Sequence, residues 1–136
     1  MKSRAQAPEE IVATLRAICL ELPAAYEETA WAGTRWKIGR HNFAHVLAID
    51  AGWPPAYAKA AGSSGPLVVV TFRVPASKLE TARFTRRPYF KPVWWPDIAG
   101  MAIDADTDWD EVAMRLADSY RALAPKRLLK SIADDG

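Results

Sequence analysis

The strongest strand signal in the sequence is the segment Leu67–Val74, which is mostly apolar, rich in β-branched residues and followed by Pro75. Its first four residues, Leu67–Val70, are all apolar, which is typical of a strand that is buried on both faces. Proline ends such a strand because it lacks the N–H group that a hydrogen-bonded ladder needs. We therefore expect a sheet in which this segment lies near the centre.

Two shorter segments upstream show the two-residue period of half-buried strands. They are Thr34–Ile38 and Phe43–Ile49, and the residues Gly39–Asn42 join them. This pattern predicts a β-hairpin. The following segment, Asp50–Pro66, contains three prolines, three glycines and two serines. It predicts a loop, in which Ala56–Ala61 can form a helical turn.

Helical periodicity appears near both ends of the chain. Apolar residues recur at helical spacing over Ile11–Leu22, and Pro23 ends this pattern. Near the other end, Asp108 and Glu111 have the spacing of a capping box. The residues after Asp108 predict a long helix, Trp109–Leu123, with one apolar face.

The region after the central strand carries weaker signals. Ser77 can cap a short helix over residues 78–83. The segment Phe84–Ile98 contains several prolines, which suit a turn that leads into an edge strand. Residues Ile98–Ile103 are predicted to prolong that strand, and Lys126–Ile132 to form a short basic helix.

The order of elements is therefore helix, hairpin, strand, short helix, strand and long helix, without regular βαβ alternation. This order predicts a two-layer α+β fold with an antiparallel sheet and helices packed on one face. With 136 residues, of which 50% are hydrophobic, the chain is expected to form one domain over residues 1–136. We expect Trp31, Trp36 and Trp109 to lie in its core.

The single cysteine, Cys19, has no partner for a disulfide and lies among apolar residues. This favours a buried, unreactive thiol in a reducing compartment. The sequence shows neither a secretory leader nor an apolar segment long enough to span a bilayer. We therefore expect a cytoplasmic protein with no membrane partner.

The net charge of +2 is unevenly distributed. Residues 29–96 hold ten basic and two acidic residues, a net charge of +8, whereas residues 1–28 carry −2 and residues 97–136 carry −4. A strongly positive segment favours anionic partners such as nucleic acids. Alternatively, the acidic ends fold over the basic middle and neutralise it.

Candidate metal and catalytic patterns are incomplete. His41 and His45 lie on a predicted strand, where four residues span about 13 Å, which is too far to share one ion. The alternating aspartates of Asp104–Asp110 lack the glycine and the bidentate glutamate of a calcium loop. No base, nucleophile and orienting group are recognisable by their spacing. We expect no metal, no cofactor and no enzymatic activity.

Three stretches of the chain have a distinctive order and spacing. They comprise Leu22–Gly33 with Trp36–Gly39 and Phe43–Ala44; Pro88–Tyr89 with Lys91 and Trp94–Trp95; and Asp108–Glu111 with Ser119–Arg121 and Ala124–Leu128. Together they cover most of the chain and resemble the MmcQ/YjbR family of small bacterial proteins. The resemblance implies a secretion-chaperone-like α+β fold and DNA binding through a double-wing arrangement. The chain departs from the family pattern at Trp36, at Arg40–His41 and in the loop Gly52–Gly65.

The recurrent polar positions of the family fall on Lys37, Tyr89, Lys91, Ser119, Tyr120 and Lys126. We expect DNA binding with weak sequence preference by a monomer, in which the hairpin tip and the basic loop act as two wings. Aromatic residues near the basic ones would add base stacking. The expected contact residues are Arg35, Lys37, Arg40, His41, Arg83, Arg86, Arg87, Tyr89, Lys91, Trp94, Lys126 and Arg127.

Two other function classes stay open at this point. One is a protein-interaction module like the secretion chaperones, which would bind a partner segment on the open face or edge of the sheet. The other is a small-molecule pocket between the sheet and the long helix, lined by Trp36, Tyr89, Trp95 and Tyr120.

Overall fold

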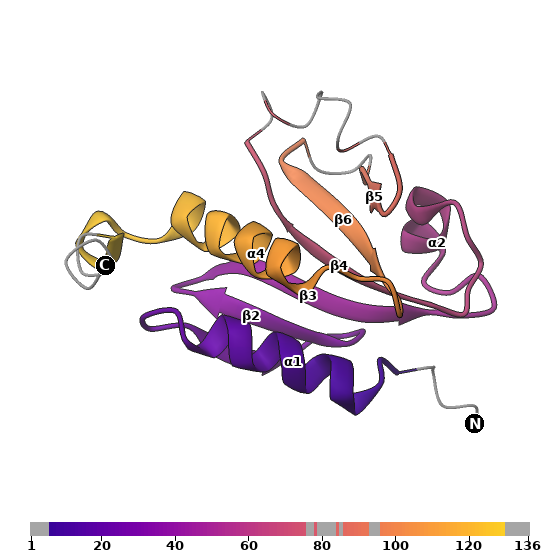
Figure 1. The fold of residues 1–136 in the computed structure, drawn as a ribbon, viewed down its shortest axis with the longest axis horizontal. Coiled ribbons are helices and arrows are strands. Elements are labelled where there is room, and N and C mark those ends of the chain that lie inside the picture. The colour runs from indigo at the N-terminus through magenta and orange to yellow at the C-terminus, as the bar shows by residue number, and fades with distance from the viewer. Residues whose placement is uncertain (1–5, 76–77, 79–83, 85, 93–95, 130–136) are drawn as a thin grey trace.

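The computed structural model, shown in Figure 1, describes residues 6–75, 78, 84, 86–92 and 96–129. Its strands form one six-stranded antiparallel sheet in the order β1-β2-β3-β4-β6-β5. The predicted α+β class is confirmed. The strands and helices are β1 (Tyr26–Thr29), β2 (Thr34–Ile38), β3 (His41–Ile49), β4 (Leu67–Arg73), β5 (Tyr89–Phe90), β6 (Ile98–Ile103), α1 (Glu9–Leu20), α2 (Pro55–Ala61) and α4 (Trp109–Leu123).

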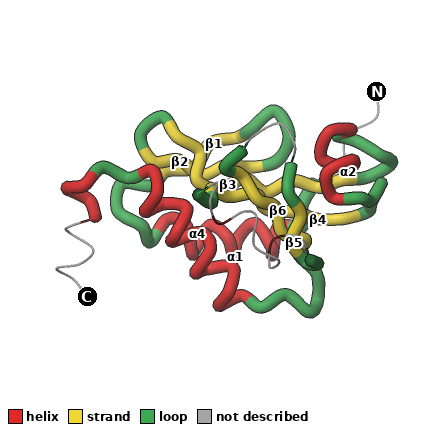
Figure 2. The backbone as a smooth tube through the Cα atoms, turned by 90° about the horizontal axis from the view of Figure 1, so that it is seen from above, coloured by secondary structure: helices red, strands yellow, loops and turns green. Residues whose placement is uncertain are grey.

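The two long helices, α1 and α4, cover one face of the sheet (Figures 1 and 2). Their apolar sides pack with the sheet in the main core, which includes the fully buried Leu15, Trp36 and Leu116. The short helix α2 packs on the opposite face, against Leu47 and Val69. Strand β3 is therefore buried on both sides along most of its length. The predicted central strand is confirmed as β4, which lies between β3 and β6.

A β-bulge in β3 joins the sheet to α4. Trp36 pairs with Ala44 but Lys37 pairs with Asn42, so Phe43 is an extra residue without an opposite partner on β2. The Ser119 hydroxyl donates to the Phe43 carbonyl at 2.6 Å. The same oxygen accepts from the backbone N–H of Arg73, at the end of β4, at 2.8 Å. One side chain of α4 thus satisfies backbone groups of two strands.

Several local predictions can be compared with the structure. The hairpin and both long helices are confirmed. Strand β1 is missing from the sequence-based order because its residues are polar and mostly exposed, so they show no hydrophobic period. Ile98–Ile103 does not prolong an edge strand: it forms β6, which separates β5 from β4. The short helix predicted over residues 78–83 falls outside the described residues, apart from Lys78.

The tryptophans differ from one another in burial. Trp36 is fully buried, as predicted, and Trp109 packs half-buried against the core. The prediction for Trp31 is wrong, because 67% of its surface is exposed. Trp31 lies in the turn between β1 and β2, where its ring meets those of Trp53 at 5.8 Å and Tyr57 at 6.3 Å instead of entering the core.

The bridge by Ser119 leads to a stability prediction. Ser119→Ala leaves the Phe43 carbonyl and the Arg73 N–H without this partner in a buried place, so we expect the free energy of unfolding to fall by about 2–4 kcal/mol. Urea titration of both proteins measures the difference. Ser64→Ala, at an exposed position, serves as the control and should change little. Equal stability of the two variants would contradict the bridging role.

Candidate functional site

The hairpin tip presents the first group of predicted contact residues. Arg40 and His41 are exposed where β2 turns into β3. The Tyr26 hydroxyl donates to the carbonyl of Gly39 in this turn at 2.6 Å. The residues that follow α4 lie at the same end of the molecule (Figure 1), and they carry the exposed Lys126 and Arg127. The structure thus collects four of the predicted basic contact residues at one end.

The basic loop lies at the other end of the sheet. Exposed Arg86 and Arg87 precede β5, in which Tyr89 pairs with Met101 of β6. Arg86 and Arg87 lie toward the end of the sheet where β3 finishes. The hairpin tip lies at the opposite end, where β3 begins. Lys91, just after β5, is also exposed. The two predicted wings are therefore separate, and the predicted residues Arg83, Trp94 and Trp95 lie outside the described residues.

Two predicted contact residues form ion pairs within the sheet. Both Arg35 and Lys37, on β2, pair with Glu28 on the neighbouring strand β1, and the Lys37 Nζ lies 3.9 Å from the carboxylate. The hydrogen bond from Arg35 lowers the pKa of Glu28. An acidic residue from the N-terminal part of the chain thus partly neutralises the basic segment here, as the alternative interpretation of the charge distribution proposed.

Tyr89 is not open for stacking with a nucleobase in this structure, because only 7% of its surface is exposed. Its ring lies edge-on to that of Phe84, with 5.0 Å between the centroids. Its hydroxyl donates to Glu111 and accepts from Arg115 Nε at 2.9 Å. Burial, followed by the bond to Glu111, raises the pKa of Tyr89. The expected stacking role of Tyr89 is therefore corrected to a structural one.

The small-molecule pocket expected between the sheet and α4 is also corrected. Trp36 and Tyr120 have no exposed surface and are part of the core. The Trp36 Nε1 donates to Glu27 at 2.9 Å, and the Tyr120 hydroxyl donates to the Pro23 carbonyl at 2.6 Å. Tight packing between sheet and helix therefore closes both side chains to a ligand.

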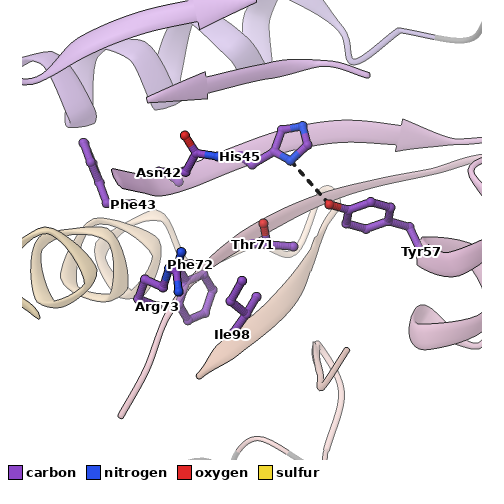
Figure 3. A pocket seen from close by; sticks show the side chains of 9 residues that line it. Asn42, Phe43, His45, Tyr57, Thr71, Phe72, Arg73 and Ile98 are labelled. Atoms are coloured by element: carbon purple, nitrogen blue, oxygen red, sulfur yellow. Dashed lines mark hydrogen bonds between the residues drawn. The ribbon is translucent and has the colours of Figure 1, made fainter. Parts of the chain in front are cut away.

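A pocket that sequence analysis missed lies on the other face of the sheet, away from α1 and α4 (Figure 3). We call it the His45 pocket. It has a volume of about 140 Å³, and polar side chains come to it from β3, β4 and α2. Its lining residues are Asn42, Phe43, Ala44, His45, Tyr57, Thr71, Phe72, Arg73 and Ile98.

The protonation of His45 follows from its partners. Its Nε2 lies 2.5 Å from the carbonyl of Ala32, so this nitrogen carries the proton and donates. The Tyr57 hydroxyl lies 3.5 Å from Nδ1, which is therefore an acceptor. Burial lowers the pKa of His45, so the ring stays neutral near pH 7.

A larger groove of about 540 Å³ lies beside the basic loop. Arg87 and Phe90 line it together with four acidic residues of the turn after β6 and the start of α4, which are Asp104, Asp106, Asp108 and Glu111. Of these, Asp108 caps α4 by accepting from the N–H groups of Asp110 and Glu111. An anionic partner that approaches Arg87 from this side meets negative charge.

Within the described part of the chain, no three His, Cys, Asp or Glu side chains come together as a metal site would need. No helix in this part is long and apolar enough to cross a membrane. Cys19 is fully buried, and burial raises the pKa of its thiol.

Comparison with protein-family models, with curated proteins and with solved structures found no match to this chain.

The buried His45 predicts a pH dependence of stability. The unfolded chain takes up a proton as the pH falls below the ordinary His pKa of 6.5, but burial holds the pKa of folded His45 lower. Protons therefore favour the unfolded chain, and stability should fall between about pH 7.5 and about pH 5.5. His45→Gln, whose amide can still donate to the Ala32 carbonyl, should show a smaller fall.

Thermal unfolding at each pH measures this effect. The exposed His41 supplies the matched control, because His41→Gln should keep the full pH dependence. If His45→Gln and the unaltered protein lost equal stability over this range, the buried neutral state of His45 would be refuted.

Proposed function

We propose that the protein is a non-enzymatic DNA-binding protein that contacts phosphates through its exposed basic side chains. The proposal rests on two groups of basic residues that are exposed to solvent. The tip group consists of Arg40, His41, Lys126 and Arg127, and the loop group of Arg86, Arg87 and Lys91. All seven side chains are exposed, and within the described residues none of them forms an ion pair.

The spacing of the two groups suits a duplex. The nine residues of β3 correspond to roughly 26 Å along the sheet, and β5 lies three strands, or about 14 Å, across the sheet from β3. The tip group and the arginines before β5 are therefore about 30 Å apart. A duplex gains length at about 3.4 Å per base pair, so phosphates about nine base pairs apart could reach both groups. Phosphate contacts position a protein without reading bases, and we therefore expect weak sequence preference. The resemblance to the MmcQ/YjbR family supports the same function.

The two groups are expected to contribute unequally. The carboxylates of the groove beside Arg87 repel phosphate and reduce the attraction of the loop group. No carboxylate forms an ion pair with the tip group within the residues that the structure describes. The tip group should therefore supply the larger share of the affinity.

Fluorescence anisotropy with a labelled random duplex of about 12 base pairs tests the proposal. With about five phosphate contacts, affinity should fall roughly 500-fold between about 50 mM and about 200 mM salt. The double variant Arg40→Ala, Lys126→Ala should reduce the slope of log affinity against log salt by about 1.8. Arg86→Ala, Arg87→Ala removes the same charge and should weaken binding less.

Lys59→Ala provides the control, since Lys59 is exposed on α2 outside both groups. DNA binding through these groups is disproved if the tip variant keeps the affinity and salt slope of the unaltered protein. Lack of binding at the lower salt concentration would disprove DNA binding altogether.

One observation favours a second candidate, a protein-interaction module. Trp31 is 67% exposed at the turn between β1 and β2, beside the rings of Trp53 and Tyr57. Large exposed aromatic side chains are enriched where proteins meet partners. Such binding would depend little on salt, and Trp31→Ala would weaken it more than loss of the tip group.

A further inference from the structure

We propose that a hollow beside the exposed Trp31 binds small monocations that carry a trimethylammonium group, such as choline. We call this hollow the Trp31 bay, and its volume is about 310 Å³. It lies where the start of α1, the turn between β1 and β2 and the end of β3 come together (Figure 1). The site does not depend on the DNA-binding proposal. Four features support it: the aromatic rings, the backbone that holds Trp31, the local charge and the size of the bay.

The first feature is a corner of aromatic rings. Trp31 and Trp53 both line the bay, with 5.8 Å between their ring centroids and an angle of 84° between their planes. The ring of Tyr57, on α2, lies 6.3 Å from that of Trp31. A cation in the corner between two perpendicular rings is attracted by the negative face of each, and aromatic cages of this kind recognise quaternary ammonium groups. Because Trp31 is 67% exposed, a ligand can reach the corner from solvent.

The second feature is the backbone that holds Trp31 in place. The carbonyl of the next residue, Ala32, accepts a hydrogen bond from His45 Nε2 at 2.5 Å. Gly33 has a φ of +76°, and a Cβ atom at this position would lie only 1.9 Å from the Val46 carbonyl oxygen. The turn is therefore pressed directly onto β3. An exposed ring on a fixed backbone is preorganised, which lowers the entropy cost of binding a ligand.

The third feature is the charge around the bay. Among the described residues that line it, the charged ones are Glu9 and Arg16. Arg16 pairs with Glu9 at 3.3 Å and with Glu27 at 2.8 Å. One guanidinium group between two carboxylates leaves one negative charge. A monocation balances this charge, whereas a zwitterion such as glycine betaine does not.

The size of the bay is the fourth feature. Strand β2 begins opposite Val46, whereas β3 continues to Ile49, and Leu47 and Ala48 line the bay beyond the end of the pairing. The bay has about twice the volume of an apolar cavity of about 150 Å³ that holds benzene. It therefore has room for choline, which has about seven non-hydrogen atoms, and for water at its open side.

An NMR titration with matched ligands tests the proposal. Choline chloride should shift the indole N–H signals of Trp31 and Trp53 in a saturable way, with sodium chloride at the same ionic strength as the reference. Dimethylbutanol with a tert-butyl end has the shape of choline but a carbon atom in place of the charged nitrogen. It should bind about tenfold more weakly, because it lacks the attraction between a cation and the rings. Glycine betaine should also bind more weakly than choline.

Variants test the assigned side chains, and the dispersion of the NMR spectrum confirms that each is folded. Trp31→Ala should weaken choline binding about tenfold, whereas Trp31→Phe keeps a ring and should weaken it about threefold. Glu9→Gln removes one negative charge and should remove the preference for choline over glycine betaine. Met114→Ala, at an exposed apolar position on α4 outside the bay, is the matched control and should bind choline normally. Arg40→Ala, Lys126→Ala should also bind it normally, so that failure of DNA binding leaves this result unchanged.

Four outcomes would overturn the site. Equal binding of choline and its uncharged analogue would show that the cation plays no part. Unchanged binding of choline to Trp31→Ala would place the ligand elsewhere. Much tighter binding of a trimethyllysine peptide or of phosphatidylcholine vesicles would assign the bay to a protein or a lipid surface instead of a small molecule. Absence of saturable shifts with choline would mean that the rings only pack against one another.

Discussion

The hydrogen bonds of Ser119 hold together the parts of this fold that are most distant in sequence. The bulge at Phe43 removes one backbone carbonyl from the ladder between β2 and β3, and a buried carbonyl without a partner is costly. Ser119 of α4 supplies that partner and also accepts from β4. The bulge in turn lets Phe43 and Ala44 both face the main core, where the Phe43 ring meets Tyr120 edge-on at 5.6 Å. The position of α4 on the sheet thus depends on this bulge.

The bulge also shapes the opposite face. It shifts the register between Asn42 and Ala44, so that Asn42 lies opposite Lys37 and His45 opposite Arg35. His45 also lies opposite Thr71 on β4, where the two side chains help to form the His45 pocket. One face of the sheet is therefore filled by aromatic and aliphatic side chains beneath two helices, while the other keeps polar groups that α2 covers only in part.

Charge is organised by strand pairing as well as by sequence. The basic segment of residues 29–96 carries +8 in the sequence, but cross-strand partners take up part of it: Glu28 pairs with Arg35 and Lys37, and Asp97 pairs with Arg73. Within the described residues, the tip group and the loop group form no ion pair, and they lie in turns, after β5 and after α4, outside the paired strands. Contacts between distant segments, more than net charge, decide which cations are available to a partner.

The central strand β4, the β2–β3 hairpin and the two long helices can be predicted from the sequence, because hydrophobic period and capping residues are local signals. Polar β1 has no such signal, and the burial of Tyr89 and exposure of Trp31 also escaped prediction. The hydrogen bond between Tyr89 and Glu111 and the position of Thr71 opposite His45 follow from the three-dimensional fold. A local pattern specifies which side of an element is apolar, whereas the partner of each polar group depends on strand register and helix docking.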